Sequence, residues 1–460
     1  MRADTYGPVV HDPVEPPTRT AKWFDLAAYL AAFGAGLGWT SWLTAASSGA
    51  PNQDEIAHIL IAKHALHDPS LLLDAWGRPA NTIAFVLPSQ FGLTGARIGA
   101  IVLSVLTILV TTRIAQHFGV KRLYLIPLFL WFQPWFHTFG HLALTEVPFT
   151  LYLACAILAW LKDRHGWAAL FFGLLPLARW EALALLPLAG VYLLVTRRWR
   201  AFAIMAAPLG AYLFISTLAG ADVNRVTDYL RMRAGAYGYG DLTHFFRTSA
   251  PLIGAPVLIL AAIGLPRMRS PKVAAVIGAW AAYFAIQVVT WYRGRGAGYA
   301  EFAMPVAPGL ALLAAFGTEH ITGLLERSRA RLIAVAKGVV IAGAATAVMA
   351  LGFQSEPHPI DLEGVAMKEA AAWLRESGIE TPRVLSTHAW FQYFYGIKFP
   401  TSHRGLIDGG RAEPPGTIMV WDRHYSNRWG YRLEDLQNAT NGWEQLETFR
   451  RGRAAIFVKL

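Results

Sequence analysis

The strongest constraint on how this chain folds is the recurrence of apolar segments long enough to cross a membrane. Residues 95–112 and 332–353 are two examples, and only 15% of the 460 residues are charged whereas 54% are hydrophobic. A soluble protein carries about 25% charged residues, and a membrane-spanning helix needs about 20 mostly apolar ones. Buried helices of a large soluble enzyme are the alternative, but they recur less often without a polar face. The sequence therefore predicts a polytopic α-helical membrane protein with about eleven spans.

The loops between the predicted spans alternate in their content of Lys and Arg. We place the spans at 24–46, 95–112, 123–137, 146–161, 167–178, 181–196, 201–220, 248–265, 273–291, 300–317 and 332–353. One set of loops holds 14 Lys and Arg in 40 residues, and the opposite set holds 9 in 93. Cytoplasmic loops collect Lys and Arg, so we predict a cytoplasmic N-terminus and long outer loops at 47–94 and 221–247. This asymmetry explains the net charge of +11 without a nucleic-acid partner.

Composition divides the chain into three parts. Residues 1–22 are polar and proline-rich and lack a signal-peptide pattern, so we predict a disordered cytoplasmic tail. Residues 23–353 form the membrane module. Residues 354–460 predict a small extracytoplasmic α/β domain, with a helix at 361–377 and strands at 383–388, 417–423 and 454–460.

Three carboxylates at the outer ends of spans are candidate catalytic groups. Asp54 and Glu55 follow the first span, and Glu146 opens another on the same predicted side. Near an apolar surface, a carboxylate can act as a general base toward a hydroxyl. The alternative is structural, because acids also stabilise the first turn of a helix. Metal binding is compatible with the acids, but the sequence has no ligand spacing that requires an ion.

Basic residues at the same predicted side are candidates for binding phosphate. Arg293 and Arg295 lie at a span boundary, and Arg179 stands with Glu181 in a charged break between two apolar segments. Guanidinium groups bind phosphate through two parallel hydrogen bonds. The alternatives are contact with ordinary lipid headgroups for the first two and an internal ion pair for Arg179. Arg231 and Arg233 are weaker candidates.

The order of these motifs resembles the GT-C glycosyltransferases, a class that includes protein O-mannosyltransferases and the lipid A aminoarabinose transferase. The similar segments are the acidic pair after the first span, GRPANTIAFVLPSQFGLTGARIGAIVLSVLTILVTTRIAQHFG, HLALTEVPFTLYLA, LARWEALALLPLAGVYLL and GAGYAEFAMPVAPGLALLAAFG. The resemblance as a whole extends over about residues 24–320. Two positions depart from the pattern. A Lys/Arg-Pro-Pro run reads Arg78-Pro79-Ala80, and an Arg-Tyr pair reads Glu301-Phe302.

The resemblance implies an inverting transferase that moves a hexose or pentose from a polyprenyl-phosphate donor to a lipid, glycan or protein acceptor. It implies that Asp54 is the base, with Glu55 beside it, and that Glu146 is the second acid. Arg295, Arg293 and Arg179 would bind the donor phosphate, and His58, His141, Glu181 and Tyr299 the acceptor or the sugar. No cofactor is required, although a divalent metal is compatible with the family.

Two other functions compete with this reading. A flippase or transporter of lipid-linked sugar usually shows internal repeats and charges at mid-membrane, whereas no repeat is evident here. An assembly protein would not require acids and arginines on one side. The Ala-, Gly- and Arg-rich composition suggests a bacterial source. We therefore predict an inner-membrane enzyme whose active site faces the periplasm or exterior.

Overall fold

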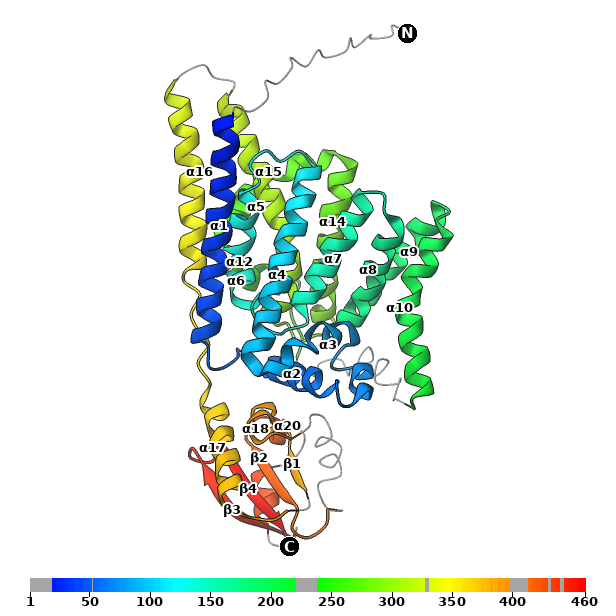
Figure 1. The fold of residues 1–460 in the computed structure, drawn as a ribbon, viewed down its shortest axis with the longest axis vertical. Coiled ribbons are helices and arrows are strands. Elements are labelled where there is room, and N and C mark those ends of the chain that lie inside the picture. Colours follow the sequence, from blue (N-terminus) through cyan, green and yellow to red (C-terminus); the bar gives the residue numbers. More distant parts are fainter. Residues whose placement is uncertain are drawn as a thin grey trace.

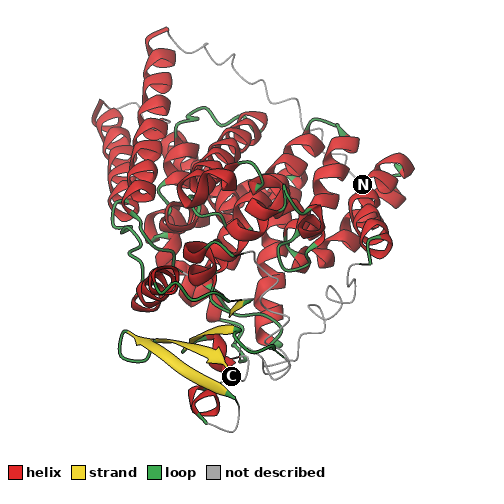
Figure 2. Ribbon diagram, turned by 60° about the horizontal axis from the view of Figure 1, so that its bottom comes forward, coloured by secondary structure: helices red, strands yellow, loops and turns green. Residues whose placement is uncertain are grey.

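The computed structural model describes residues 19–51, 53–220, 238–326, 331–381, 383–397, 413–428, 432–438 and 442–460. A body of helices ends in a smaller unit that carries all the described strands (Figures 1 and 2). Residues 1–18 of the predicted tail 1–22, most of the outer loop 221–247, and Arg231 and Arg233 lie outside the described residues. The last four residues of that predicted tail are described and belong to the first helix.

The helical body contains long helices joined by short helical pieces. Its long helices are α1 (Arg19–Ala46), α4 (Gly92–His117), α7 (Glu146–Leu161), α8 (His165–Ala178), α10 (Trp199–Leu218), α14 (Pro271–Tyr292), α15 (Ala307–Glu326) and α16 (Arg331–Gly352). Its shorter helices are α2 (Asp54–His64), α3 (Pro79–Phe85), α5 (Leu125–Trp131), α6 (Pro134–Phe139), α9 (Leu186–Val195), α12 (His244–Ile253) and α13 (Ala255–Gly264). Among its described residues there are also five 3₁₀ turns: η1 (Pro69–Leu73), η2 (Pro88–Phe91), η3 (Trp180–Leu185), η4 (Leu265–Arg269) and η5 (Ala300–Val306).

The structure supports membrane spans but not a count of eleven. Within the described residues, four helical stretches are long and apolar enough to cross a membrane: Pro88–His117, Trp199–Leu218, Pro271–Tyr292 and Ala300–Leu325. The bent pair α12–α13 would add a fifth, and several apolar helices are shorter than a full span.

Two predicted spans are broken by local backbone chemistry. The segment 123–137 divides into α5 and α6 at Gln133, which is extended because Pro134 follows it. The segment 248–265 bends by 105° between α12 and α13. Gly254 at this bend has φ of 87°, a conformation that glycine adopts without strain. Hydropathy alone cannot detect such breaks.

Close helix packing holds the body together at small residues. A Cβ atom on Gly317 in α15 would overlap the carbonyl oxygen of Leu260 in α13, and one on Gly264 would overlap that of Leu313. Glycine therefore lets the two backbones touch, as small residues do between membrane helices.

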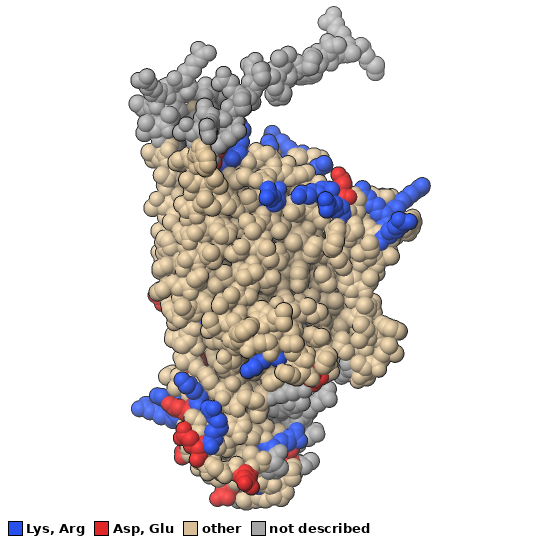
Figure 3. Space-filling model, in the orientation of Figure 1, with Lys and Arg blue, Asp and Glu red and all other residues tan. Residues whose placement is uncertain are grey.

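The two ends of the body differ in what they carry. The beginning of α1, the end of α15 and the beginning of α16 lie at one end, whereas α2, α3 and the C-terminus lie at the other (Figure 1). Figure 3 shows a broad band with almost no charged side chains on this face, bounded by mostly Lys and Arg at the first end and by charges of both signs on the C-terminal unit. The predicted outer loop 47–94 and the C-terminal unit therefore lie at the same end of the molecule.

The C-terminal unit is a four-stranded sheet with helices packed on it. Its elements are α17 (Leu362–Glu376), β1 (Val384–Ser386), α18 (Ala389–Tyr395), β2 (Ile418–Asp422), α20 (Tyr425–Arg428), α21 (Leu433–Gln437), β3 (Trp443–Phe449) and β4 (Ala454–Lys459). The strand order is β1-β2-β4-β3, with β1 and β2 parallel and the other pairs antiparallel. The helix and three strands predicted here are present. The edge strand β3 was not predicted, because most of its residues are polar and exposed.

Candidate active site

The first wall of the site is α2, which begins directly after the loop that follows α1. Acids open this helix at Asp54 and Glu55, where the helix dipole favours negative charge. The two side chains have different surroundings: Asp54 lines a polar pocket, whereas Glu55 is fully buried against Arg97.

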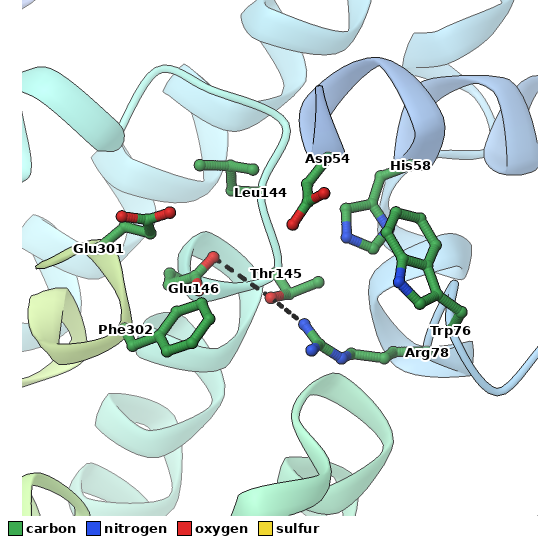
Figure 4. A pocket seen from close by; sticks show the side chains of 9 residues that line it. All are labelled: Asp54, His58, Trp76, Arg78, Leu144, Thr145, Glu146, Glu301 and Phe302. Atoms are coloured by element: carbon green, nitrogen blue, oxygen red, sulfur yellow. Dashed lines mark hydrogen bonds between the residues drawn. The ribbon is translucent and has the colours of Figure 1, made fainter. Parts of the chain in front are cut away.

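The pocket is formed where four separate stretches of chain meet. Figure 4 shows Asp54, His58 and Trp76 on one side of Thr145, with Glu146, Phe302 and Glu301 on the other. Its lining residues are Asp54 and His58 from α2, Trp76 and Arg78 before α3, Leu144, Thr145 and Glu146 at the start of α7, and Glu301 and Phe302 in η5. The site therefore joins three carboxylates and a guanidinium from distant parts of the sequence.

Arg78 enters this pocket from an unusual backbone conformation. Its φ is 60° and its ψ is 104°, in a region that side-chain-bearing residues seldom occupy. The Nη1 atom of Arg78 donates to Oγ1 of Thr145 at 2.5 Å. Such strain costs about 1–3 kcal/mol and is found most often at functional sites. Sequence reasoning noted Arg78 only as a departure from a family motif.

Glu146 belongs to a buried network centred on Arg179. Arg179 forms an ion pair with Glu146, and its Nη2 donates to Oε1 of Glu181 at 3.1 Å. The Oγ1 of Thr145 lies 3.2 Å from Oε2 of Glu146. The Arg179 guanidinium also lies 4.3 Å from the centre of the Phe302 ring. The internal ion pair, which was the structural alternative for Arg179, is therefore present, and neither Arg179 nor Glu181 is among the residues that line the pocket.

Glu55 has a different environment from the one expected of a neighbour of a catalytic base. Its two carboxylate oxygens accept from Nε and Nη2 of Arg97 at 2.9 and 2.7 Å, and Oε1 also accepts from the backbone N–H of Ala143 at 3.1 Å. Both side chains of the pair are almost completely buried. Glu55 therefore fixes the start of α2 against α4 and the loop before α7, and this geometry argues against contact with substrate.

Arg97 is a residue that sequence reasoning did not select. Besides Glu55, it donates to the carbonyl oxygens of Ser47 and Gly49 at 2.8 and 2.5 Å. A single Arg near the beginning of an apolar helix is a signal that could have drawn attention to Arg97. Its partner Glu55 lies 42 positions earlier, so the sequence alone does not pair the two. Arg97 and Glu55 together hold the loop that leads to Asp54.

His58 lines the pocket as a neutral imidazole. Its ring stacks on Trp76, with centroids 4.4 Å apart and planes 17° apart. Burial lowers the pKa of His58 well below its usual value, and the charges of Arg78 and Arg179 lower it further. His58 can therefore accept or donate one hydrogen bond at neutral pH without adding charge.

The remaining predicted residues lie outside the pocket. His141 is buried and stacks at 6.1 Å on His358. Arg293 and Arg295 are exposed at the end of α14, and Tyr299 is half exposed with its ring edge-on to Phe302. Within the described part of the chain, no group of three His, Cys, Asp or Glu side chains is arranged to hold a metal ion.

Comparison with protein families decides the class of the chain. The model of glycosyltransferase family 87 matches residues 78–316, just over half of the sequence. The chain belongs to glycosyltransferase family 87. This match covers Arg78, Glu146 and Glu301 of the pocket and begins after Asp54. It supports the predicted transferase over the flippase and the assembly protein, and no curated protein sequence matches the chain significantly.

Solved structures show the same overall fold. The crystal structure of ArnT from Cupriavidus metallidurans bound to undecaprenyl phosphate aligns with a TM-score of 0.63 and 13% identity, over 96% of this chain and 99% of that one. The apo form of that ArnT aligns with a TM-score of 0.61 and 12% identity, over the same shares of the two chains. This family 87 protein is thus an integral membrane glycosyltransferase of GT-C type.

Proposed function

We propose that the protein transfers a hexose or pentose from a polyprenyl-phosphate donor to an acceptor hydroxyl in the Asp54 pocket. The observation that carries this proposal is the meeting of Asp54, Glu146 and Arg78 in one pocket. A relative with the same fold was solved with undecaprenyl phosphate bound. Because phosphate is a stable leaving group, such a donor needs no nucleotide site.

In this proposal Asp54 is the general base. The acceptor oxygen attacks the anomeric carbon, the bond from that carbon to the phosphate oxygen breaks, and Asp54 takes the hydroxyl proton. Polyprenyl phosphate leaves with the electron pair of the broken bond. A positioned base contributes about 10²–10⁴-fold to such a step, and alignment of the hydroxyl contributes further.

Arg78 is the proposed partner of the phosphate. It lies in the same pocket as Asp54 and brings a fixed positive charge to the place where negative charge develops. Glu146, held by Arg179 and Thr145, would orient the acceptor or the sugar. Arg293 and Arg295, on the exposed end of α14, would attract the phosphate before it enters the pocket.

The proposed setting is the periplasmic face of a bacterial inner membrane. The loops rich in Lys and Arg would then be cytoplasmic, and residues 354–460 would form an extracytoplasmic α/β domain. The isoprenoid tail of the donor would lie along the apolar helices while its sugar reaches the pocket.

A transfer assay tests the proposal. Purified protein is given radiolabelled polyprenyl-phosphate hexoses and pentoses with lipid, glycan and peptide acceptors, with and without a chelator. We expect Asp54→Asn to lower kcat by at least about 100-fold. Asp163→Asn, an exposed acid in the turn between α7 and α8, is the matched control and should leave kcat unchanged. Wild-type protein that neither transfers nor hydrolyses any donor, or full activity of Asp54→Asn, would overturn the proposal.

A further inference from the structure

The segment that leads from α1 to Asp54 is held from outside by the chain that enters the C-terminal unit. The Oγ of Ser47 accepts from the N–H of His358 at 2.9 Å, and the N–H of Gly49 donates to the carbonyl of His358 at 2.8 Å. A Cβ atom on Gly49 would overlap the carbonyl oxygen of Pro359. Because only glycine permits this approach, the two chains form a close crossing, and Arg97 holds the same segment from inside.

A side chain of the C-terminal unit reaches the residue next to Asp54. The Nε2 atom of His388 lies 2.6 Å from the amide Nε2 of Gln53, the residue that immediately precedes α2. Gln53 also closes the first turn of the helix, since its carbonyl accepts from the N–H of Ala57. The hydrogen bond between His388 and Gln53 therefore restrains the backbone that carries Asp54.

His388 is itself fixed within the C-terminal unit. It is completely buried between β1 and α18, and its backbone N–H donates to Oγ of Ser386 at 3.2 Å. Burial lowers the pKa of His388 to about 4, so the ring is neutral at pH 7. A neutral ring nitrogen can accept from the Gln53 amide, which only donates through its nitrogen.

A second contact fixes the orientation of the unit on the helical body. The helix α18 packs against α2. The hydroxyl of Tyr393 in α18 accepts from the N–H of Leu93 at 3.2 Å, at the beginning of α4. With contacts at Gln53 and Leu93, the unit is held at two places far apart in the sequence, so His388 has a defined position relative to the pocket.

We propose that the C-terminal unit is a positioning element of the active site, in which His388 fixes Gln53 and thereby Asp54. His388 is a positioning residue because it does not line the pocket. This inference rests on the proposed role of Asp54. A displacement of about 1 Å at a reacting group can lower a rate about 100-fold. Loss of this contact should therefore lower kcat and leave donor KM nearly unchanged, since the other pocket residues remain.

Variants at both ends of the contact test the inference. His388→Phe keeps the ring volume and removes the acceptor, so we expect kcat to fall about 10- to 100-fold, with donor KM changed less than about twofold. His388→Gln supplies a carbonyl oxygen in place of the ring nitrogen and should restore much of the rate. His424→Phe is the control, because His424 is another histidine of the same unit and is mostly exposed.

A double-mutant cycle separates this contact from general damage. Gln53→Leu should lower kcat as His388→Phe does, and the double variant should be no slower than either single one. Losses that multiply in the double variant, or a fully active His388→Phe, would overturn the inference. A fall in rate that His388→Gln does not relieve, with a parallel fall for His424→Phe, would also overturn it.

Amide hydrogen exchange gives a readout that needs no turnover. His388→Phe should speed exchange at the first amides of α2 that follow Asp54, whereas His424→Phe should not. If the wild type proves inactive with every donor, the proposed function fails while this measurement still applies. Unchanged exchange in His388→Phe would then reject the positioning role itself.

Discussion

At the scale of single residues, the pocket combines groups with different tasks. Asp54 faces the pocket, whereas the adjacent Glu55 is enclosed by Arg97 and a backbone N–H. Removing one member of a buried ion pair costs about 3–5 kcal/mol, because the other charge remains without compensation. Of the two neighbouring carboxylates, Glu55 therefore supports the fold, and Asp54 is the one available for the proposed catalytic role.

Arg78 allows stability and activity to be separated in one variant. Arg78→Gly should relieve the positive φ of 60°, a strain of about 1–3 kcal/mol for a residue with a side chain. We expect an apparent melting temperature equal to or above that of the wild type, together with a loss of transfer of at least about tenfold.

The measurement is thermal melting in detergent beside the transfer assay. Arg78→Lys keeps the charge without the bidentate fork and should be intermediate in rate. A marked fall in melting temperature for Arg78→Gly would show that the guanidinium mainly supports the fold.

Glu363 predicts how the stability of the C-terminal unit depends on pH. Burial raises the pKa of this carboxyl to about 7, and the nearby Asp422 and Asp361 contribute to the rise. The folded state therefore binds a proton that the unfolded chain releases above about 4.5. The free energy of unfolding should fall as pH rises through this interval up to about 7.

Glu363→Gln mimics the protonated side chain and should remove the loss of stability that accompanies rising pH. We expect the variant to melt at a higher temperature than the wild type at pH 8 and at a similar temperature at pH 4.5. His388 titrates in the opposite sense in both proteins, so the difference between them isolates Glu363. An equal difference in melting temperature between the two proteins at pH 4.5 and pH 8 would contradict the raised pKa of Glu363.

At the scale of elements, glycine determines which helices touch. Gly317 and Gly264 allow α13 and α15 to meet along their backbones, whereas Gly343 in α16 has open space where a Cβ would lie. The same residue type thus has a packing role in one helix and none in another.

Alanine at these positions distinguishes the two cases. Gly317→Ala should lower the melting temperature, because the new methyl group forces α13 and α15 apart. Gly343→Ala should be neutral or stabilising, since alanine has the higher helix propensity by about 1 kcal/mol. Thermal melting of the two variants checks this, and equal effects would contradict the packing argument.

At the scale of the whole molecule, hydropathy predicted most helices, and charge predicted which loops share an end. The helix breaks at Gln133 and Gly254 were not predicted from hydropathy, because each depends on one local backbone angle. Of the pocket residues, Asp54 and Glu146 were selected from the sequence because they lie at the outer ends of predicted spans. Arg78 and Glu301 were not, because only the folded chain brings their loops together.

The sidedness of the molecule is testable with reporters. Alkaline phosphatase fused after Leu460 should be active, and a fluorescent reporter that matures only in the cytoplasm should be dark at the same position. We expect this because the C-terminus lies at the end of the molecule that carries α2 and α3, which we predict to be the outer end. Fusions after His117, at the opposite end of α4, should give the reverse pattern. Matching signals at both positions would reject the predicted topology.

The crossing of residues 358–360 over Gly49 also has a consequence for biosynthesis. The loop before Asp54 is among the first parts of the chain to leave the ribosome, and His388 is among the last. Domains form in the order in which they are synthesised, so the helical body can insert long before the C-terminal unit contacts Gln53 beside α2. We expect nascent chains that end before residue 388 to be integrated into the membrane yet at least about 10-fold less active than the full chain, which delays full activity until synthesis is nearly finished.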